Sequence, residues 1–196
     1  MFSLTNKHAV ITGGGSGIGK AISTLFARQG ATVHIIELNA DAASQTAEEI
    51  KSEGGQAFAY AADISKQQQV QEVVGKITKV DILVNNAGIA HVGNLEGTAE
   101  ADLDRIYNVN VKGAYNALYA AIPKMKANGG GAIVNMASIA AWVGLTDRFA
   151  YSMSKGAIMA MSLSVARDYL ADNIRCNTIS PARVHTPFVD GFIAKN

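Results

Sequence analysis

Tyr151 and Lys155 are the residues of this chain whose types and spacing most clearly suggest chemistry. They lie four residues apart in a stretch typical of a helix, so their side chains share one face and can converge. A nearby ammonium favours the tyrosinate and lowers the tyrosine pKa from its usual value of about 10, which would make Tyr151 a base near neutral pH. Ser138, thirteen residues earlier, offers a hydroxyl that can hold a substrate oxygen. The pair alone also fits a surface tyrosine and a solvated lysine.

A glycine cluster near the N-terminus suggests a phosphate-binding turn. Residues 12–19 read Thr-Gly-Gly-Gly-Ser-Gly-Ile-Gly and directly follow a short apolar run. Glycine there permits a tight turn and close approach of backbone N–H groups to a pyrophosphate, and the next helix adds partial positive charge at its N-terminus. The spacing of Gly13, Gly17 and Gly19 is one residue longer than the common dinucleotide fingerprint. An ordinary strand-to-helix turn is the alternative, but the position after the first predicted strand favours a nucleotide.

Glu37 indicates which nicotinamide cofactor the chain would bind. It ends the next predicted strand, 18 residues after Gly19. A carboxylate there can accept hydrogen bonds from both adenosine ribose hydroxyls and repels a 2′-phosphate. Since no lysine or arginine occupies residues 14–16 or 38–39, the sequence predicts NAD rather than NADP. The alternative is a solvated acid at a strand end.

Strand-like apolar runs alternate with helical patterns along the chain, and these elements must position the two motifs. Strands are predicted at 8–11, 32–36, 57–60, 80–84, 131–136 and 174–179, and helices after the glycine cluster and at 41–53, 67–77, 100–126 and 149–170. Strands apolar on both faces and separated by helices indicate a parallel sheet covered on both sides. We therefore predict a single doubly wound, Rossmann-like α/β domain over residues 1–196, with ligands at the carboxyl ends of its strands. Because the chain ends in a polar loop after the sixth strand, we expect its last strand to be missing.

The composition fits an ordinary folded domain and excludes several classes of protein. The 196 residues are 48% hydrophobic and 17% charged, and the net charge of +1 lacks the basic excess of a nucleic-acid-binding protein. The single cysteine, Cys176, excludes an internal disulfide and favours a reducing compartment. The N-terminus is too short and polar for a signal peptide, and no apolar run approaches the roughly 20 residues that span a bilayer. We expect a cytoplasmic protein with no membrane or nucleic-acid partner and, lacking any cluster with metal-ligand spacing, no metal site.

Together these motifs resemble the short-chain dehydrogenase/reductase family, in the branch with Thr-Gly-x-x-x-Gly-Ile-Gly and Tyr-x-x-x-Lys. The resemblance extends from the first strand to Thr186. It implies that Tyr151 is the general acid/base and that Ser138 orients and polarises the carbonyl. It also implies that Lys155 binds the nicotinamide ribose and lowers the tyrosine pKa, and that Asn110 helps to hold a water in a proton relay with this lysine.

The resemblance further implies a set of cofactor contacts and an assembly. The contacts are Gly13, Ser16, Gly17, Ile18, Gly19, Glu37, Asp63, Ile64, Asn86, Ala87, Gly88, Tyr151, Lys155, Pro181, Val184 and Thr186. Ala182 stands where the family usually has glycine, which costs little unless the backbone needs positive φ. Homo-oligomers, dimers or often tetramers, with two long helices packed across an interface, are implied as well, and family chains usually extend one strand and one helix further.

Arg148 is the main sequence indication of the substrate. It lies three residues before Tyr151, which would put its guanidinium near the catalytic hydroxyl if the helix extends to it, and arginine binds carboxylates in bidentate geometry. The segment 147–151 also looks like family members that act on hydroxy acids and deoxy-sugar acids. We therefore predict an NAD-dependent dehydrogenase of a hydroxy acid or a sugar-derived acid. The alternative is an arginine paired with Asp147 or with an oligomer neighbour.

Other residues are expected around the substrate. Arg183 and His185 lie in the loop that forms part of the substrate lid in the family, and His185 is taken as a substrate contact. His91, which follows the Asn-Asn-Ala-Gly segment, could also lie at the edge of the pocket, although the sequence does not favour this position. Trp142 and Val143 are expected on or beneath the pocket wall. Neutral sugars, simple alcohols and 3-oxoacyl compounds remain alternative substrates. A protein that binds NAD without turnover, to sense or to scaffold, is an alternative of a different class.

Overall fold

The computed structural model describes residues 2–186, which contain one six-stranded sheet with every neighbouring pair of strands parallel. The strands are β1 (His8–Thr12), β2 (Thr32–Glu37), β3 (Gln56–Ala61), β4 (Ile82–Asn85), β5 (Gly131–Met136) and β6 (Ile174–Ile179). Their order across the sheet is β3-β2-β1-β4-β5-β6. The order in which strands are added to the sheet therefore reverses at β1 and β4: β2 and β3 lie on one side of β1, and β4, β5 and β6 lie on the other. Such a switch point is where open α/β sheets bind ligands. The predicted doubly wound fold is confirmed.

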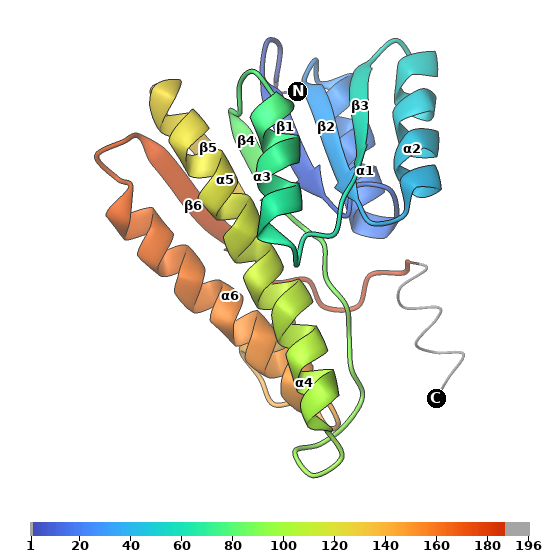
Figure 1. Cartoon of the computed structure of the whole chain (residues 1–196), viewed down its shortest axis with the longest axis vertical. Helices are drawn as coiled ribbons and strands as arrows, with labels where there is room; N and C mark the ends of the chain where they lie inside the picture. The colour runs from blue at the N-terminus through green and yellow to red at the C-terminus, as the bar shows by residue number, and fades with distance from the viewer. Residues whose placement is uncertain (1, 187–196) are drawn as a thin grey trace.

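Helices connect the strands and form the outer layers of the domain (Figure 1). They are α1 (Gly17–Arg28), α2 (Ala40–Ser52), α3 (Gln67–Lys76), α4 (Glu100–Ile106), α5 (Gly113–Ala127) and α6 (Phe149–Asp168), together with a π-helical segment η1 (Tyr107–Lys112) and a 3-10 turn η2 (Ile139–Ala141). Within residues 2–186, no helix combines the length and apolar character needed to cross a membrane.

The long helix predicted over residues 100–126 has a more complex form in the structure. The π-helical segment η1 separates α4 from α5, so one wider turn interrupts the α-helical hydrogen bonding. Pro123, which we expected to bend or end this helix, lies inside α5, and the helix continues to Ala127. A proline removes only one backbone N–H donor, and close packing of Ala121, Ile122 and Met125 in the core stabilises the last turns around it.

Both faces of the sheet are buried against helices. Along β1, Ala9 and Ile11 pack with residues of α1 and α2, whereas Val10 points to the opposite face and packs with residues of α3 and α5. The same alternation holds on β2, where Ile35 and Ile36 belong to different core clusters. This burial on both faces explains why β1 and β2 are largely apolar, with His34 as a buried polar exception in β2.

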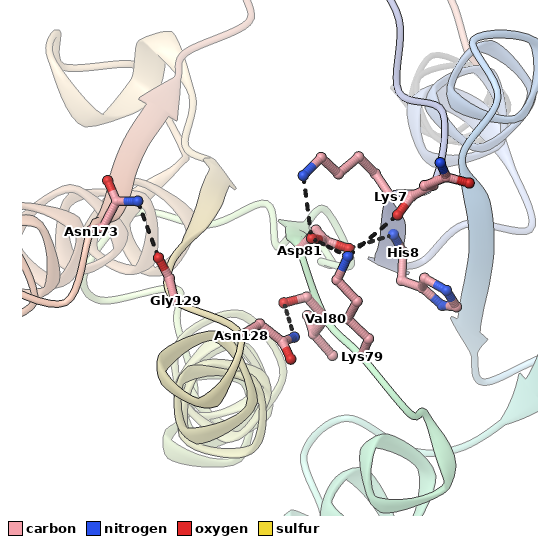
Figure 2. Close-up of polar contacts among 9 residues, drawn as sticks. Lys7, His8, Lys79, Val80, Asp81, Asn128, Gly129 and Asn173 are labelled. Carbon is pink, nitrogen blue, oxygen red and sulfur yellow. Dashed lines mark hydrogen bonds and ion pairs between the residues drawn. The ribbon is translucent and has the colours of Figure 1, made fainter.

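The amino ends of β1 and β4 are joined by a polar cluster that Figure 2 shows, on the edge opposite the carboxyl ends. The Asp81 carboxylate accepts a hydrogen bond of 2.9 Å from the backbone N–H of His8, and its other oxygen lies 3.0 Å from Lys79 Nζ and 3.5 Å from Lys7 Nζ. At the same edge, the Asn128 amide donates to the Val80 carbonyl at 3.4 Å. These contacts fix the register from which the strands run toward the site.

Candidate active site

A cavity of about 350 Å³ lies at the carboxyl ends of the strands. Residues that were more than 100 positions apart in the sequence meet on its walls. Among the predicted cofactor contacts, every one except Gly19 lines it, and so does Ser138. Further lining residues were not predicted from the sequence, and they are Ile36, Leu38, Ala62, Ile89, Val109, Met136, Ala137 and Ala182. Most of these are apolar or small, so they form smooth walls and carry no motif that a sequence pattern could reveal.

The glycine turn after β1 is held against the end of β4 by reciprocal hydrogen bonds. Thr12 Oγ1 accepts from the backbone N–H groups of Asn86 at 3.1 Å and Ala87 at 3.2 Å, while Asn86 Nδ2 donates to the Thr12 and Gly13 carbonyls at 3.1 Å each. Gly13 has φ of +65°, and a Cβ there would come within 2.9 Å of Ala87 Cα. Only glycine satisfies both the positive φ and the close approach of the two loops.

The turn provides the surroundings that a pyrophosphate requires. A Cβ at Gly19 would collide with the backbone carbonyl of Gly13, so the helix can start close beneath the turn only with glycine at that position. Helix α1 begins at Gly17, and the side chain of its N-cap residue, Ser16, makes no capping hydrogen bond. Ser16, Gly17 and Ile18 line the cavity, so the amino end of α1 with its partial positive charge faces this space. The residues present therefore fit a dinucleotide.

Glu37 lines the other end of the cavity with its carboxylate already oriented. Oε1 accepts from the backbone N–H of Leu38 at 2.9 Å and of Asn39 at 3.4 Å, and Oε2 accepts from the N–H of Gly15 at 3.3 Å. Asp63 lines the cavity nearby, and its Oδ1 accepts from the N–H of Ser65 at 2.9 Å. Backbone donors thus fix two carboxylates beside a space lined by glycine and apolar residues.

Ser138, Tyr151 and Lys155 converge on the opposite end of the cavity. Ser138 follows β5 and caps η2, where its Oγ accepts from the N–H of Ala140 at 3.2 Å. Hydrogen bonding by the Ser138 side chain acts to lower the pKa of Tyr151, which lies on the first turn of α6. Lys155 is 6% exposed, its Nζ lies 5.8 Å from the centroid of the Tyr151 ring, and it donates to the Met136 carbonyl at 2.7 Å. The hydroxyls of Ser138 and Tyr151 and the ammonium of Lys155 therefore belong to residues that line the same cavity.

The pKa of Tyr151 differs from the sequence expectation. Burial raises the pKa of this tyrosine above its ordinary value, although the hydrogen bond with Ser138 and the charge of Arg148 act in the opposite direction. The prediction that Lys155 lowers the pKa of Tyr151 is therefore wrong for the structure without bound cofactor. Burial also lowers the pKa of Lys155 to about 8, so the ammonium loses its proton more readily than that of an exposed lysine. One ammonium hydrogen is donated to the Met136 carbonyl. Sequence spacing revealed the proximity of the two groups but not their loss of solvent.

Asn110 lies in η1 and faces the loop after β4. Its Oδ1 accepts from the Ile89 N–H at 2.8 Å, and its Nδ2 donates to the Ile89 carbonyl and to Ser154 Oγ, both at 2.9 Å. A Cβ added to Gly88 would lie 3.3 Å from Asn110 Oδ1 and 3.5 Å from Lys155 Nζ, so the two side chains flank the same glycine. The structure brings Asn110 close to the lysine, with both amide hydrogens engaged by protein atoms.

Arg148 lies just outside the cavity lining. Helix α6 begins one residue later, at Phe149, so Arg148 is the N-cap residue and does not share a helical face with Tyr151. Its Nη1 donates to the Asp147 carbonyl at 2.7 Å, and its charge still acts on the Tyr151 hydroxyl. The backbone around it is fixed, because the Gly93 N–H donates to the Asp147 carbonyl at 3.0 Å and the Phe149 N–H donates to the Gly93 carbonyl at 3.1 Å. The loop after β4 thereby positions this arginine.

The remaining predicted substrate residues also lie outside the cavity lining, which contains none of His91, Trp142, Val143, Arg183 and His185. His91 Nδ1 lies 3.8 Å from the Asp102 carboxylate, at the start of the helix that leads to η1. Trp142 Nε1 donates to Ser180 Oγ at 3.1 Å, and the indole is 66% exposed. Among residues 2–186, no group of three or more His, Cys, Asp or Glu side chains gathers as a metal site would require.

Comparison with known proteins identifies this arrangement. The family model described as short chain dehydrogenase matches residues 7–195. The chain belongs to the short-chain dehydrogenase family. An uncharacterized oxidoreductase of Thermotoga maritima shares 41% identity over 191 residues, which are 96% of this chain and 75% of that protein. Members of this family are oxidoreductases that act on CH–OH groups with a nicotinamide cofactor, and the present chain is one of them.

Two solved short-chain dehydrogenases superpose closely on the chain. A 7α-hydroxysteroid dehydrogenase complexed with NADH and 7-oxo glycochenodeoxycholic acid has a TM-score of 0.92 and 38% identity, covering 96% of this chain and 75% of its own. An NAD+-bound xylitol dehydrogenase has a TM-score of 0.91 and 31% identity, covering 94% of this chain and 73% of its own. The fold of the cofactor-binding part is therefore shared with dehydrogenases whose ligands differ.

Proposed function

We propose that the protein is an NAD-dependent dehydrogenase of a secondary alcohol that carries a carboxylate, a hydroxy acid or a sugar-derived acid. One observation carries the acidic part of this proposal: the bridge to Gly93 holds Arg148 directly before α6, next to the turn that carries Tyr151, and the arginine charge acts to lower the pKa of this tyrosine. A substrate whose hydroxyl meets Tyr151 would have its carboxylate within the field of this guanidinium. The bridge from Gly93 to the backbone on both sides of Arg148 supports a fixed position for the cation.

The preference for NAD rests on Glu37. Its carboxylate is held by three backbone N–H groups at the adenosine end of the cavity, so it cannot easily turn away from a bound nucleotide. Two ribose hydroxyls could donate to its remaining lone pairs, whereas a 2′-phosphate would meet a fixed negative charge. Gly13, Ser16, Gly17, Ile18 and Gly19 would hold the pyrophosphate. Asp63 and Ile64 would contact the adenine, and Asn86, Ala87, Gly88, Pro181, Val184 and Thr186 the rest of the cofactor.

The proposed chemistry divides proton transfer from hydride transfer. Bound NAD supplies the hydride acceptor for oxidation and, in its reduced form, the donor for the reverse reaction. Tyr151 takes the proton of the substrate hydroxyl during oxidation and returns it during reduction. Ser138, which lies beside Tyr151 on the cavity wall, donates a hydrogen bond that stabilises the developing charge on the substrate oxygen. Lys155, which lines the same cavity, would bind the nicotinamide ribose, and Asn110 would take part in the proton relay through a water.

The solved relatives support the acidic class without excluding the neutral one. The hydroxysteroid dehydrogenase binds a ligand named as an acid, whereas xylitol dehydrogenase is named for a neutral polyol. A neutral sugar, a simple alcohol or a 3-oxoacyl compound is therefore the second candidate. A protein that binds NAD without turnover is less consistent with the convergence of Ser138, Tyr151 and Lys155 on one cavity.

Absorbance of the reduced nicotinamide, measured with a panel of substrates, tests the proposal. NAD or NADP would be offered with hydroxy acids, sugar acids, neutral sugars and simple alcohols. We expect turnover of acids with NAD, and Arg148→Ala should raise KM for them about tenfold or more while changing kcat less. Arg175→Ala, which removes an exposed cation from β6, is the matched control and should leave KM unchanged. Turnover of neutral compounds alone would contradict the acidic class.

The cofactor preference has a separate test. Glu37→Ser removes the fixed negative charge while leaving the cavity open, and we expect the ratio of kcat/KM for NADP to that for NAD to rise by about tenfold or more. Glu48→Ser, which removes an exposed carboxylate from α2, is the matched control. An unchanged ratio would show that Glu37 does not select the cofactor.

We also propose that the protein forms homodimers or homotetramers through α5 and α6. Tyr115 and Tyr119 on α5 are 45% and 52% exposed, and Leu163 on α6 is 73% exposed. Large apolar side chains gathered on two neighbouring helices favour a second copy of the chain as their partner. Light scattering would give the mass, and Leu163→Glu should shift it toward the monomer.

A further inference from the structure

Two serines on the buried face of α6 make the same pair of hydrogen bonds. Ser154 is 0% exposed and Ser162 is 3% exposed. Ser154 Oγ donates to the Tyr151 carbonyl, and Ser162 Oγ donates to the Ile158 carbonyl, both at 2.7 Å. Each serine also accepts from an asparagine amide outside the helix. A hydroxyl that donates back to its own helix keeps a lone pair directed outward, where it can anchor a donor from another element.

The two anchors lead to different parts of the molecule. Ser162 accepts from Asn135 Nδ2 of β5 at 2.8 Å, and Asn135 Oδ1 in turn accepts from Asn85 Nδ2 of β4 at 2.8 Å. None of these three residues lines the cavity. This chain of hydrogen bonds therefore joins α6 to the middle of the sheet, and it serves the packing of the domain.

The Ser154 anchor ends at residues of the site. Ser154 accepts from Asn110 Nδ2 at 2.9 Å, and the same amide donates to the Ile89 carbonyl at 2.9 Å. Both hydrogens of the Asn110 amide are thereby used. At its other end this series of hydrogen bonds stops at the backbone carbonyl of Tyr151, which accepts from Ser154 Oγ. Since Ile89 and Tyr151 both line the cavity, one buried hydroxyl connects the loop after β4, the π-helical segment and the first turn of α6.

We propose that Ser154 is a positioning residue for the dehydrogenase reaction, holding the first turn of α6, and with it Tyr151, in register with Asn110 and Ile89. The Tyr-x-x-x-Lys spacing of Tyr151 and Lys155 assigns no role to this hydroxyl, so the proposal goes beyond that motif. Only its kinetic test rests on the proposed function, and the structural test below is independent of any substrate.

Loss of the Ser154 hydroxyl would act in two places. The Asn110 amide would keep one hydrogen without a partner in a fully buried position, so η1 would have to shift or admit water. The carbonyl of Tyr151 would lose its side-chain donor, at the turn that also carries the bond between Ser138 and the tyrosine hydroxyl. A displacement of a fraction of an ångström at a reacting group is enough to slow a reaction markedly.

Ser154→Ala and Ser162→Ala form the matched pair for the test, because both remove a buried serine with the same bonds from the same helix. Hydrogen exchange followed by mass spectrometry reads the coupling directly. With Ser154→Ala, we expect faster exchange in peptides that cover Ile89 and residues 107–112. With Ser162→Ala, exchange should rise around β5 and remain unchanged in those peptides.

The effect of each substitution on the reaction is measured by steady-state kinetics. The substrates are NAD and the panel compound that the wild-type protein oxidises fastest. We expect Ser154→Ala to lower kcat about tenfold while KM for both substrates stays within about twofold. Ser162→Ala should lower the melting temperature but leave kcat within about twofold. Ser154→Cys, which keeps the volume and weakens the hydrogen bond, serves if the alanine variant does not fold, and it should lower kcat in the same direction.

Three results would overturn the proposal. Unchanged exchange at Ile89 and residues 107–112 in Ser154→Ala would show that the hydroxyl does not hold these segments together. Changed exchange with unchanged kcat would show a structural role only. Equal losses of kcat in both serine variants would show that general loosening of α6 is responsible. A wild-type protein without turnover would contradict the proposed function, and the exchange result would still decide the coupling.

Discussion

The two edges of the parallel sheet are built from similar polar residues and serve opposite purposes. At the amino edge, Asp81 is satisfied by the His8 N–H and by Lys7 and Lys79, and burial, which raises its pKa, is outweighed by these partners, so that the pKa is lowered (Figure 2). At the carboxyl edge, burial moves the pKa of Tyr151 up and that of Lys155 down, each toward its uncharged form. The amino edge stabilises the charge of Asp81, whereas burial at the carboxyl edge disfavours the charged forms of Tyr151 and Lys155.

This difference explains how one sheet combines a stable fold with a reactive site. Parallel strands present N–H groups at one end and carbonyl groups at the other, and helices cover both faces, so polar side chains gather at the ends. Where every group finds a partner, the contact adds stability. Where groups face a cavity, part of their hydrogen-bonding capacity stays open, which lowers stability and allows chemistry.

Tyr151→Phe should produce the largest effect and separate chemistry from stability. The substitution removes the hydroxyl that we propose transfers the proton, so we expect kcat to fall by about a thousandfold. Fluorescence titration with NADH should give nearly the same Kd, since the ring remains in place. The melting temperature should not fall, because a hydroxyl at the carboxyl edge is not needed for folding. A variant with wild-type kcat would assign proton transfer to another group.

Asp81→Ala should produce the reverse pattern at the amino edge. It leaves the His8 N–H and two lysines without their carboxylate, and we expect the free energy of unfolding to fall by about 2 kcal/mol. Urea denaturation measures this loss. Turnover per folded molecule should stay within about twofold of the wild type. If kcat fell in proportion to stability, the two edges would be coupled rather than separate.

Lys155→Met should stabilise the protein while it abolishes activity. The lowered pKa of about 8 means that the folded state binds fewer protons than the unfolded state between pH 8 and 10.5, so wild-type stability rises with pH across this window. Removing the buried ammonium relieves a cost on the order of 3 kcal/mol near pH 7, offset by the lost bond to Met136, which leaves a gain of about 1 to 2 kcal/mol.

Denaturant midpoints of the wild type and of Lys155→Met, measured from pH 7 to pH 10.5, would show how the difference in their free energies of unfolding depends on pH. The advantage of Lys155→Met over the wild type should shrink as the pH rises through this range, because deprotonation relieves the same cost in the wild-type protein. A variant less stable than the wild type at pH 7 would mean that the Met136 contact outweighs burial of the charge.

His34, a buried residue of β2, provides the prediction with the smallest expected effect, which concerns how stability depends on pH. Burial, and then the neighbouring His8, lowers the pKa of His34 to about 4. The unfolded chain binds more protons between pH 6.5 and 4, so this contribution to stability is complete above pH 6.5 and is lost as the pH falls toward 4. In His34→Phe, the decline of melting temperature between pH 6.5 and 4 should be shallower. An identical decline would mean that other groups control it.

The sequence was sufficient for the fold because the strand signals are local. Six apolar runs and the helices between them determine a parallel sheet, and the glycine turn lies after β1, at the carboxyl end of the sheet. The convergence of Ser138, Tyr151 and Lys155 also followed from their predicted positions at a strand end and on one helical face.

Other features of the site depend on contacts between distant segments and escaped prediction. The pKa shifts of Tyr151 and Lys155 arise from burial, which a residue spacing does not report. Arg148 lies before α6 rather than on it, since the bridge to Gly93 holds its backbone in a non-helical conformation. The role of Ser154 follows only from the position of Asn110, which lies 44 residues earlier in the chain.

The π-helical segment η1 has a consequence for the kinds of mutation that this chain can tolerate. A π turn holds one more residue than an α turn, and helical phase advances by about 100° per residue. Deleting a single residue from Tyr107–Lys112 could restore unbroken α-helix while turning Asn110 away from Ile89, with α5 still packed on its neighbours. We therefore expect codon deletions in this segment at positions other than Asn110 to yield folded but inactive protein, an outcome that resembles replacement of a catalytic side chain although no such side chain is lost.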